Sequence, residues 1–465
     1  MAHGSGGALR STALPVVPRI SADASSALVP SVSLVRGRIQ PPPPSSAAAA
    51  LGATVLLVLG AAAGCTSQER ATPAESRPSS TANGSTATAS TPSSTTPSST
   101  TPGPTATAAP TPDPPRRISL LVSGDVLLHS GTWDTARADA ARRGEPGLDF
   151  RPMLASVAPA VRPTDLAICH LETPLAPRRG PFASYPTFSA PPQVVSALLD
   201  TGYDACTTAS NHSLDQGADG LARTLRILDR KGLEHDGSAR SRREHRRPLL
   251  LDVGGVRVAV LSYTYGTNGI PLPSGQPWAV PLIDPDEIVA DAAAARRGGA
   301  DVVAVALHFG TEYVTAPDAY QLGVVEEITR SPDIDLVYGH HAHTVQPLDR
   351  VHGTWVAYGL GNFVAQQETS QTHTYRGASL RFELTRRPGD RFEVSDIAYL
   401  PTMITPYNPA DPRMRVLDVP AELRDGSTSR HLRESLAATL AAVRSDLLSL
   451  GADNQDDVAV HLLRQ

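Results

Sequence analysis

The chain has 465 residues, of which 41 are Lys or Arg and 46 are Asp or Glu, so its formal net charge at pH 7 is −5. This mild acidity gives no electrostatic reason to expect nucleic acid as a partner, because nucleic-acid binding generally needs a basic surface. The length allows two or three domains if every residue takes part in folding, but one long segment is unsuited to folding.

The first 65 residues, 1–65, predict an N-terminal extension that ends in a lipoprotein-type signal. The run AAAALGATVLLVLGAAAGCTSQ is apolar over the length of a signal peptide and then reaches small residues and Cys65. Arg36 and Arg38 supply a basic flank. We expect a lipid on Cys65 to hold the chain at the extracytoplasmic face of the cell membrane. The alternative is a single N-terminal transmembrane anchor, for which this apolar run is short.

Residues 66–116 predict a disordered spacer, because they consist almost wholly of Ser, Thr, Pro, Ala and Gly. Such a composition buries too little apolar surface to offset the entropy lost on ordering. The remaining residues, 117–465, are enough for one large domain with a well-buried core. Cys169 and Cys206 fall in predicted strands without a wider cysteine framework. We interpret them as buried thiols, with a disulfide as the alternative.

An α/β domain is predicted from residue 118 onward, where short apolar runs of β type alternate with helical patterns. Continuous apolar runs are typical of strands buried on both faces. The predicted strands are 118–123, 165–169, 203–209, 256–263, 301–307 and 334–339, followed by 354–359 and 378–384, which look more antiparallel. The predicted helices are 192–202, 218–232 and 286–299, each ending in Gly, and a C-terminal amphipathic helix at 429–450.

Polar side chains follow five of the predicted strands. In α/β sheets, ligands gather at the carboxyl ends of the strands, so these side chains can converge on one site. The five strand ends carry Asp125; Glu172; Asn211, His212 and Asp215; His308; and the run GHHAH with His340, His341 and His343.

The donor atoms of this set predict a metal site. Carboxylate, amide and imidazole groups form a mixed oxygen and nitrogen set that suits Mn, Fe, Zn or Ni rather than a thiolate site. If Glu172 lies between two metal ions, it can bridge them at roughly 3.5–4 Å, as in two-metal phosphoesterases and peptidases. We therefore expect two divalent metal ions as cofactors.

Seven phrases occur in a fixed order between about residues 118 and 365: GDVLLH, HLETPL, FSAPPQVVSALLDTGYDACTTASNHSLDQGADGLARTLRILDRKG, LSYTYGTNG, LHFGTEY, GHHAHTVQP and YGLGNFV. The order of their polar residues is similar to that of calcineurin-like metallophosphoesterases. Their wording resembles more closely the bacterial capsule-synthesis CapA family, which is associated with poly-γ-glutamate. The resemblance implies a four-layer α/β/β/α sandwich of the metallophosphoesterase type, here with a C-terminal helix.

The resemblance also implies a role for each residue of the metal site. Glu172 looks like the bridge between the two ions, at a position where metallophosphoesterases generally have Asp. The other implied ligands are Asp125 and His343 for the first ion, and Asn211, His308 and His341 for the second. Along an extended strand end, His341 and His343 face the same side and His340 faces the other. We therefore expect His340 to be structural.

Two further residues are implied to act in catalysis. His212 resembles the histidine beside the scissile bond, which protonates a leaving oxygen or stabilises the charged transition state. Asp215 follows it closely in the chain and can orient the His212 ring.

The sequence departs from the family patterns at two positions. Leu127 stands where metallophosphoesterases usually have a second ligand of the first ion, and His129 is the nearest substitute along the chain. His170 stands where the capsule family often has Asn, and we interpret it as structural, as we do His373. These departures predict a weakly bound first ion or a site with one ion.

Two functions fit these motifs. The first is a membrane-anchored, extracytoplasmic CapA-like protein that helps to make, export or attach an anionic capsule polymer such as poly-γ-glutamate. The alternative is an active metal-dependent hydrolase that cleaves a phosphoester or an amide of a cell-envelope substrate. The expected partners are an anionic cell-envelope polymer or its synthesis machinery, and the membrane through the lipid anchor, but no nucleic acid.

Overall fold

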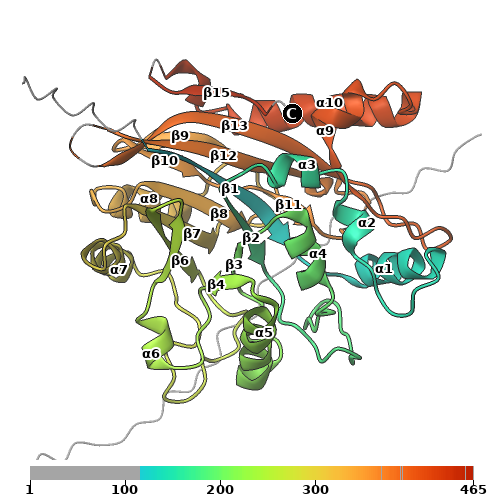
Figure 1. Cartoon of the computed structure of the whole chain (residues 1–465), viewed down its shortest axis with the longest axis horizontal. Coiled ribbons are helices and arrows are strands. Elements are labelled where there is room, and N and C mark those ends of the chain that lie inside the picture. The colour runs from blue at the N-terminus through green and yellow to red at the C-terminus, as the bar shows by residue number, and fades with distance from the viewer. Residues whose placement is uncertain (1–115, 368, 388, 390, 456, 464–465) are drawn as a thin grey trace, which may run out of the picture. The chain divides into compact units, whose positions relative to one another are not determined.

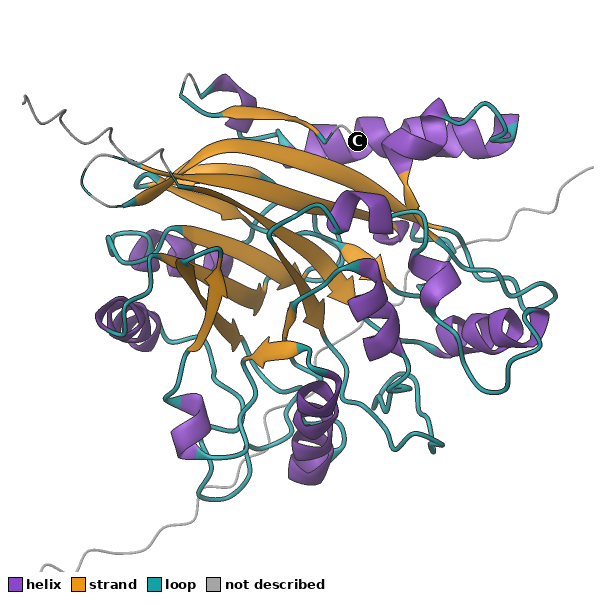
Figure 2. Ribbon diagram, viewed as in Figure 1, coloured by secondary structure: helices purple, strands orange, loops and turns teal. Residues whose placement is uncertain are grey.

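The structure, a computed structural model, describes residues 116–463 except for 368, 388, 390 and 456. Within these residues two β-sheets lie face to face and helices flank them, as Figure 1 and Figure 2 show. The predicted signal with Cys65 and the predicted spacer up to residue 115 lie outside the described residues.

The first sheet has nine strands in the described part of the chain and combines both strand directions. Its central strand β1 (Arg117–Val126) pairs in parallel with β2 (Leu166–Leu171) and antiparallel with β12 (Arg376–Arg386). The order is β14 (Val416–Asp418), β13 (Phe392–Ile404), β12, β1, β2, β3 (Ala205–Thr207) and β4 (Glu234–Asp236), while β11 (Asn362–Val364) also pairs with β1 and β15 (Ala459–Leu462) with β13.

The second sheet has six strands among the described residues. Their order is β5 (Leu249–Val253), β6 (Val256–Thr264), β7 (Val302–Phe309), β8 (Leu336–His341), β10 (Thr354–Ala357) and β9 (Leu348–Val351). Strands β6, β7, β8 and β10 run parallel, whereas β5 and β9 pair antiparallel at the edges. The central strands β7 and β8 are buried along their whole length, which explains their continuous apolar runs.

Three apolar clusters give the layers of the fold. One packs α1 (Ser130–Arg142), α2 (Arg151–Leu154), α3 (Ala158–Val161), α4 (Val194–Thr201) and α5 (Gly217–Lys231) on the first sheet. A second lies between the sheets, and a third packs α7 (Pro285–Arg297) and α8 (Ala319–Ile328) on the second sheet. This arrangement confirms the predicted four-layer α/β/β/α sandwich. The other helices are α6 (Arg242–His245), α9 (Val419–Arg424) and α10 (Arg430–Leu447), with short 3₁₀ turns at Thr372–Tyr375 and Ala452–Asn454.

The helix boundaries follow local chemistry. Gly202 and Gly232 close α4 and α5 with φ angles of 113° and 73°, a left-handed conformation that glycine adopts without steric cost. The Asp284 side chain caps α7 by accepting hydrogen bonds from two backbone N–H groups of its first turn. The C-terminal helix that we predicted at 429–450 is α10, which packs against β13.

Two strand predictions need correction. The segment 203–209 forms a strand only at β3, because the chain leaves the sheet as it approaches Asn211. The segment 354–359, which looks antiparallel in sequence, pairs antiparallel with β9 but parallel with β8. The prediction for 378–384 is confirmed, since β12 is antiparallel to both of its main neighbours.

The two strand cysteines form a disulfide, so their interpretation as free thiols was wrong. Cys169 of β2 and Cys206 of β3 are register partners in the parallel ladder, with their Cα atoms 4.4 Å apart, and their sulfur atoms are bonded. Both side chains lie in the apolar cluster beneath the helices. Because side chains alternate along a strand, the next residue on β2, His170, faces the opposite sheet.

Candidate metal centre

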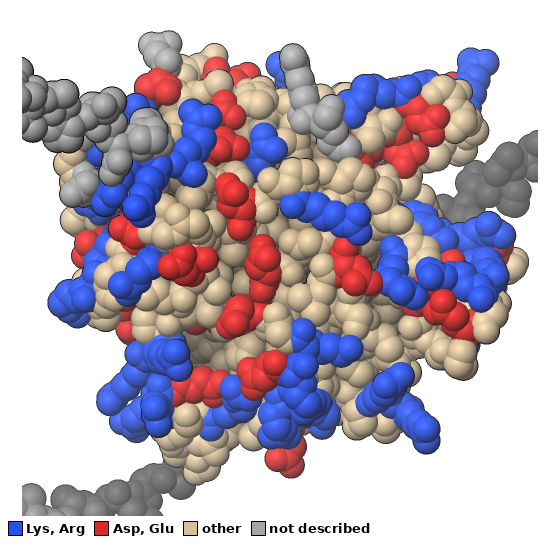
Figure 3. All heavy atoms as spheres, in the orientation of Figure 1, with Lys and Arg blue, Asp and Glu red and all other residues tan. Residues whose placement is uncertain are grey.

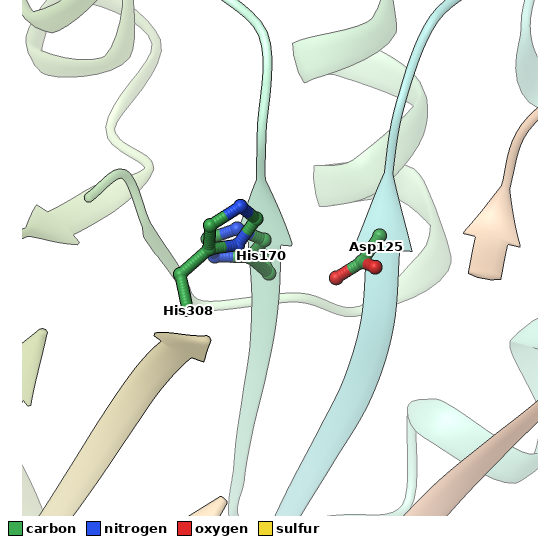
Figure 4. Close-up of side chains that lie close together, drawn as sticks. All are labelled: Asp125, His170 and His308. Atoms are coloured by element: carbon green, nitrogen blue, oxygen red, sulfur yellow. The ribbon is translucent and has the colours of Figure 1, made fainter. Parts of the chain in front are cut away.

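Four buried polar side chains close one end of the apolar layer between the sheets. On β2, β7 and β8 the last apolar residue of this layer is followed two positions later by His170, His308 and His340. Asp125 lies at the end of β1 in register with His170, and His308 is in register with His340. Two register pairs, one from each sheet, therefore meet, and Figure 4 shows three of these side chains.

Asp125 is tied to the second sheet by hydrogen bonds. Its Oδ1 lies 2.9 Å from His340 Nδ1, and its Oδ2 lies 3.1 Å from His343 Nδ1 and 3.3 Å from the backbone N of His341. Burial by itself would raise the pKa of Asp125, but the hydrogen bonds from His340 and His343 hold this pKa well below its usual value. Asp125 is therefore a carboxylate whose charge the protein already compensates.

The chain turns sharply after β8. His341 and His343 have φ angles of 85° and 55°, in the left-handed region that residues other than glycine seldom adopt. The turn places the His341 ring 4.8 Å from the His308 ring and 6.0 Å from the His343 ring, measured between centroids. The prediction of an extended strand end was wrong: His341 and His343 converge through a turn. His340, which we expected to point away, faces Asp125 instead.

Glu172 is a buried carboxylate without a hydrogen-bond donor. It is 1% exposed, and neither side-chain oxygen has a partner among the described residues. Its Oε1 lies 3.9 Å from His308 Nε2 and 3.8 Å from His343 Nε2. Burial raises the pKa of Glu172 well above its usual value, although the charge of His343 works in the opposite direction.

Asn211 and His308 meet on the other side of the site. Asn211 Oδ1 lies 2.9 Å from His308 Nε2, and Asn211 Nδ2 donates to Asn268 Oδ1 at 3.2 Å. Burial lowers the pKa of His308 well below its usual value and that of His341 to about 3. Both rings are therefore neutral at physiological pH, which is the form of histidine that binds metal ions.

His343 differs from these two rings in its charge. Burial by itself would lower its pKa, but the carboxylates of Glu172 and Asp125 raise it to about 9. Its Nδ1 also lies 3.0 Å from Asn362 Oδ1. Before a metal ion arrives, a protonated His343 thus supplies the positive charge nearest to Glu172.

His212 and Asp215, the predicted catalytic pair, are in direct contact. His212 Nδ1 lies 2.7 Å from Asp215 Oδ2, which also accepts a hydrogen bond from the backbone N of Phe188 at 2.7 Å. The Phe188 ring stands edge-on to the His212 ring, with 4.7 Å between the centroids. These contacts fix the ring through Nδ1 and leave Nε2 for a substrate.

The ligand missing at Leu127 is not replaced by His129. Leu127 is buried in the apolar cluster beneath the helices. His129 Nδ1 lies 3.2 Å from the carbonyl oxygen of Leu127 and 3.3 Å from the backbone N of Gln366. In the described part of the chain, His129 belongs to none of the groups of three or more His, Asp or Glu residues that could hold a metal ion.

The predicted ligands do come together, and their donor set fits a divalent cation. Ligand atoms of Asp125, Glu172 and His343, the set expected for the first ion, all lie within 4.8 Å of one another. In the second set, His308 lies close to Asn211, to Glu172 and to the ring of His341. Since an unpaired carboxylate is costly to bury, the orphaned oxygens of Glu172 favour a cation among these groups.

Sequence reasoning missed three residues of this site. His170, which we interpreted as structural, forms a second group with Asp125 and His308, again within 4.8 Å. The second is His340, and the third is exposed Glu312, which forms such a group with His341 and His343. Glu312 could have been predicted as a site residue from its place in LHFGTEY, immediately after the strand that ends near His308.

Comparison with known proteins finds a match over the part of the chain that carries the site. A family model described as "Bacterial capsule synthesis protein PGA_cap" matches residues 119–367. The PGA biosynthesis protein CapA of Bacillus subtilis (strain 168) is 29% identical over 205 residues, which cover 44% of this chain and 53% of that protein. A probable polyglutamine synthesis accessory protein of Mycobacterium tuberculosis is 32% identical over 239 residues, which cover 47% and 60%. The chain thus spans about half the length of the curated relatives that it matches.

Solved structures also share similarity with the chain. A calcineurin-like phosphoesterase, YfkN of Bacillus subtilis, is 16% identical with a TM-score of 0.36, and the match covers 72% of this chain and 99% of that one. A putative 5'-nucleotidase from Staphylococcus aureus is 17% identical with a TM-score of 0.39, over 70% of this chain and 58% of that one.

Proposed function

Because the chain belongs to the bacterial capsule synthesis protein family, whose model covers residues 119–367, we propose that it takes part in the synthesis or export of an anionic capsule polymer such as poly-γ-glutamate. The name of its relative in Bacillus subtilis, which refers to PGA biosynthesis, supports this proposal. The matched range also contains the whole candidate metal centre, from Asp125 to His343.

The metal centre is proposed to hold two divalent ions, drawn from Mn, Fe, Zn and Ni. The observation that carries this proposal is Glu172, a buried carboxylate that has no donor in the described structure and whose Oε1 lies within 3.9 Å of both His308 and His343. Asp125, Glu172 and His343 would hold the first ion, and Asn211, His308 and His341 the second, with Glu172 shared. Bound divalent ions supply Lewis acidity toward a carbonyl or phosphoryl oxygen.

The protein's own residues prepare this site for an anionic ligand. His340 holds Asp125 through Oδ1. The turn after β8 brings the His341 ring beside His308 and directs His343 toward Asp125 on the opposite sheet. On the face shown in Figure 3, basic and acidic side chains of the described residues are interspersed, so that face offers a polyanion no large uniform basic surface. We propose that the polymer's carboxylates bind at the metal centre, and we propose no nucleic-acid partner.

A second candidate function, metal-dependent hydrolysis of a phosphoester or an amide of a cell-envelope substrate, is favoured by the His212–Asp215 pair. The 2.7 Å contact through Nδ1 leaves His212 Nε2 available to donate a proton to a leaving oxygen. An accessory protein that only binds its polymer has no need of this pair. Activity toward a phosphodiester or a γ-glutamyl substrate therefore separates the two functions.

The proposed place of action is the extracytoplasmic face of the cell membrane, with a lipid on Cys65 as the anchor and a single N-terminal helix as the alternative. The sequence of the signal supports this proposal. Within residues 116–463, apart from the few not described, no helix has both the length and the apolar character needed to cross a bilayer.

Polymer production in cells tests the proposed function. A strain that lacks this protein should regain polymer when the wild-type chain is supplied, and Glu172→Gln should bind less metal and fail to restore it. Glu326→Gln is a matched control, because Glu326 is an exposed residue paired with Arg330. If the well-expressed wild-type chain restores no polymer, the capsule function is refuted; if Glu172→Gln restores it fully without metal, the role of the metal is refuted.

A further inference from the structure

We propose that His170 is an additional metal ligand, which binds through Nε2 an inner ion held together with Asp125 and His308, so that His308 belongs to this inner ion rather than to the second ion. This inference rests on the proposed metal function and extends it. It adds a ligand to the six that are proposed above.

The strand register brings the three groups together. His170 is the register partner of Asp125 on the adjacent parallel strand, and both side chains face the second sheet. His308 comes from that second sheet, and the ligand atoms of the three residues lie within 4.8 Å of one another. Figure 4 shows the carboxylate of Asp125 directed toward the rings of His170 and His308. All three residues are no more than 1% exposed.

Hydrogen bonding fixes the tautomer that His170 needs. Its Nδ1 lies 2.9 Å from Thr207 Oγ1, and the Thr207 hydroxyl donates to the backbone carbonyl of Cys169 at 3.4 Å. Since that hydroxyl proton is in use, Thr207 accepts from Nδ1–H, and the lone pair of His170 lies on Nε2. A metal-bound histidine generally has its other ring nitrogen held in this way.

Two ring nitrogen atoms without hydrogen-bond partners among the described residues indicate the position of the proposed ion. His170 Nε2 and His308 Nδ1 are buried and have no hydrogen-bond partner among the described residues. The two rings are stacked with 4.9 Å between their centroids. Core histidines normally have their polar atoms satisfied, so two orphaned nitrogens beside a carboxylate indicate a cation. His308 can bind it through Nδ1 while its Nε2 remains 2.9 Å from Asn211 Oδ1.

This inner group also compensates for the metal ligand that is missing at Leu127. The side chain there is apolar and buried beneath the helices, so β1 supplies Asp125 but no second ligand. The neighbouring strand supplies one instead, because His170 lies beside Asp125 in the sheet.

Metal binding by the whole chain tests the proposal, with Zn²⁺ and Co²⁺ as the probes. We expect His170→Asn to lose one bound ion per chain or to weaken its binding at least 100-fold in a chelator competition, and to change the visible spectrum of the Co²⁺ form. Thr207→Val keeps the ligand but removes the hydrogen bond to Nδ1, and should weaken the same ion by roughly 10–100-fold. His235→Asn, which removes a histidine of β4 that pairs with Asp229, is the control and should match the wild type.

The outcomes separate this inference from the function on which it rests. If the wild-type chain binds metal and His170→Asn binds the same number of ions with the same affinity and Co²⁺ spectrum, His170 is not a ligand while the metal function stands. If His170→Asn does not fold, Thr207→Val decides: wild-type affinity for every ion overturns the inference. If the wild-type chain binds no metal, the metal function and the inference fall together.

Discussion

Replacing Glu172 by Gln should change the stability of the metal-free and the metal-loaded chain in opposite directions. Burial raises the pKa of Glu172 well above its usual value, so the folded state binds this proton more tightly than the unfolded state does. The stability of the metal-free wild type therefore falls as pH rises from the unfolded pKa of about 4.3 toward the folded value, and the full penalty persists above that value. Gln has nearly the same shape and does not titrate, so it removes the penalty.

The size of each effect follows from the linkage between binding and folding. Each unit by which the folded pKa of Glu172 exceeds the unfolded pKa corresponds to about 1.4 kcal/mol, so the metal-free variant should gain free energy of unfolding at pH 8. A domain of this size changes its Tm by about 2 °C per kcal/mol, so each unit of the pKa shift corresponds to a rise of about 3 °C. Metal at 100 times its Kd should stabilise the wild type by about 2.7 kcal/mol, or about 5 °C. The variant lacks the shared ligand and should lose most of this gain.

Thermal unfolding followed by circular dichroism measures both effects, at pH 8 and pH 5, after chelation and again with Zn²⁺ or Mn²⁺. At pH 5 the advantage of the metal-free variant should shrink, because little of the penalty has developed so close to the unfolded pKa. Glu326→Gln removes one exposed charge and should leave both melting temperatures within about 1 °C of the wild type. A metal-free Glu172→Gln chain that melts below the wild type at pH 8 would refute the reasoning.

Three other predictions follow from the same contacts. His212→Ala should keep its metal content, because we assign His212 to the substrate and not to a metal ion. It should lower turnover of a phosphodiester or γ-glutamyl substrate by roughly two to four orders of magnitude. A loss of metal comparable to that of His341→Ala contradicts the assignment. Because the pKa of His343 is raised to about 9, metal binding must displace its proton. The apparent affinity, measured by chelator competition, should therefore rise about tenfold per pH unit from pH 7 to pH 9, and a flat profile contradicts the role of His343 as a ligand. Cys65→Ser should move the chain from the membrane fraction to the soluble fraction, and a variant that stays in the membrane at wild-type levels rules out the lipid anchor.

The strands that carry the site could be predicted because buried strands are rich in apolar residues. The runs that became β1, β2, β7 and β8 are mainly apolar and almost wholly buried, and each is followed by a polar motif. Their common carboxyl end then brings Asp125, Glu172 and His308 together without any knowledge of the loops. The direction of β10 could not be predicted, because composition does not reveal that one strand pairs in parallel on one side and antiparallel on the other.

The predictions that were wrong concern backbone geometry and strand register, which the pattern of apolar residues does not encode. Strict alternation predicted that His340 points away, but it is the next inward residue after Tyr338, and it is His341 that leaves the strand through a positive φ angle. The disulfide and the place of His170 both follow from the register of β2 with its neighbours, which pairs Cys169 with Cys206 and His170 with Asp125. A single sequence contains no direct record of that register.

The two buried acids of the site explain how the chain can fold before it binds metal and why binding then matters. Asp125 is compensated within the protein, because hydrogen bonds from His340 and His343 hold its pKa low, so it remains an anion that links the two sheets. Glu172 lacks any such donor in the described structure, and the nearest positive charge is a protonated His343 at 3.8 Å. A cation held by these groups would take the place of the proton of His343 and offset the cost of burying the Glu172 carboxylate, whereas the links between Asp125 and the second sheet can persist. The stabilisation by metal should therefore depend mainly on Glu172 and much less on Asp125. The opposite changes in the stability of Glu172→Gln with and without metal measure this difference directly.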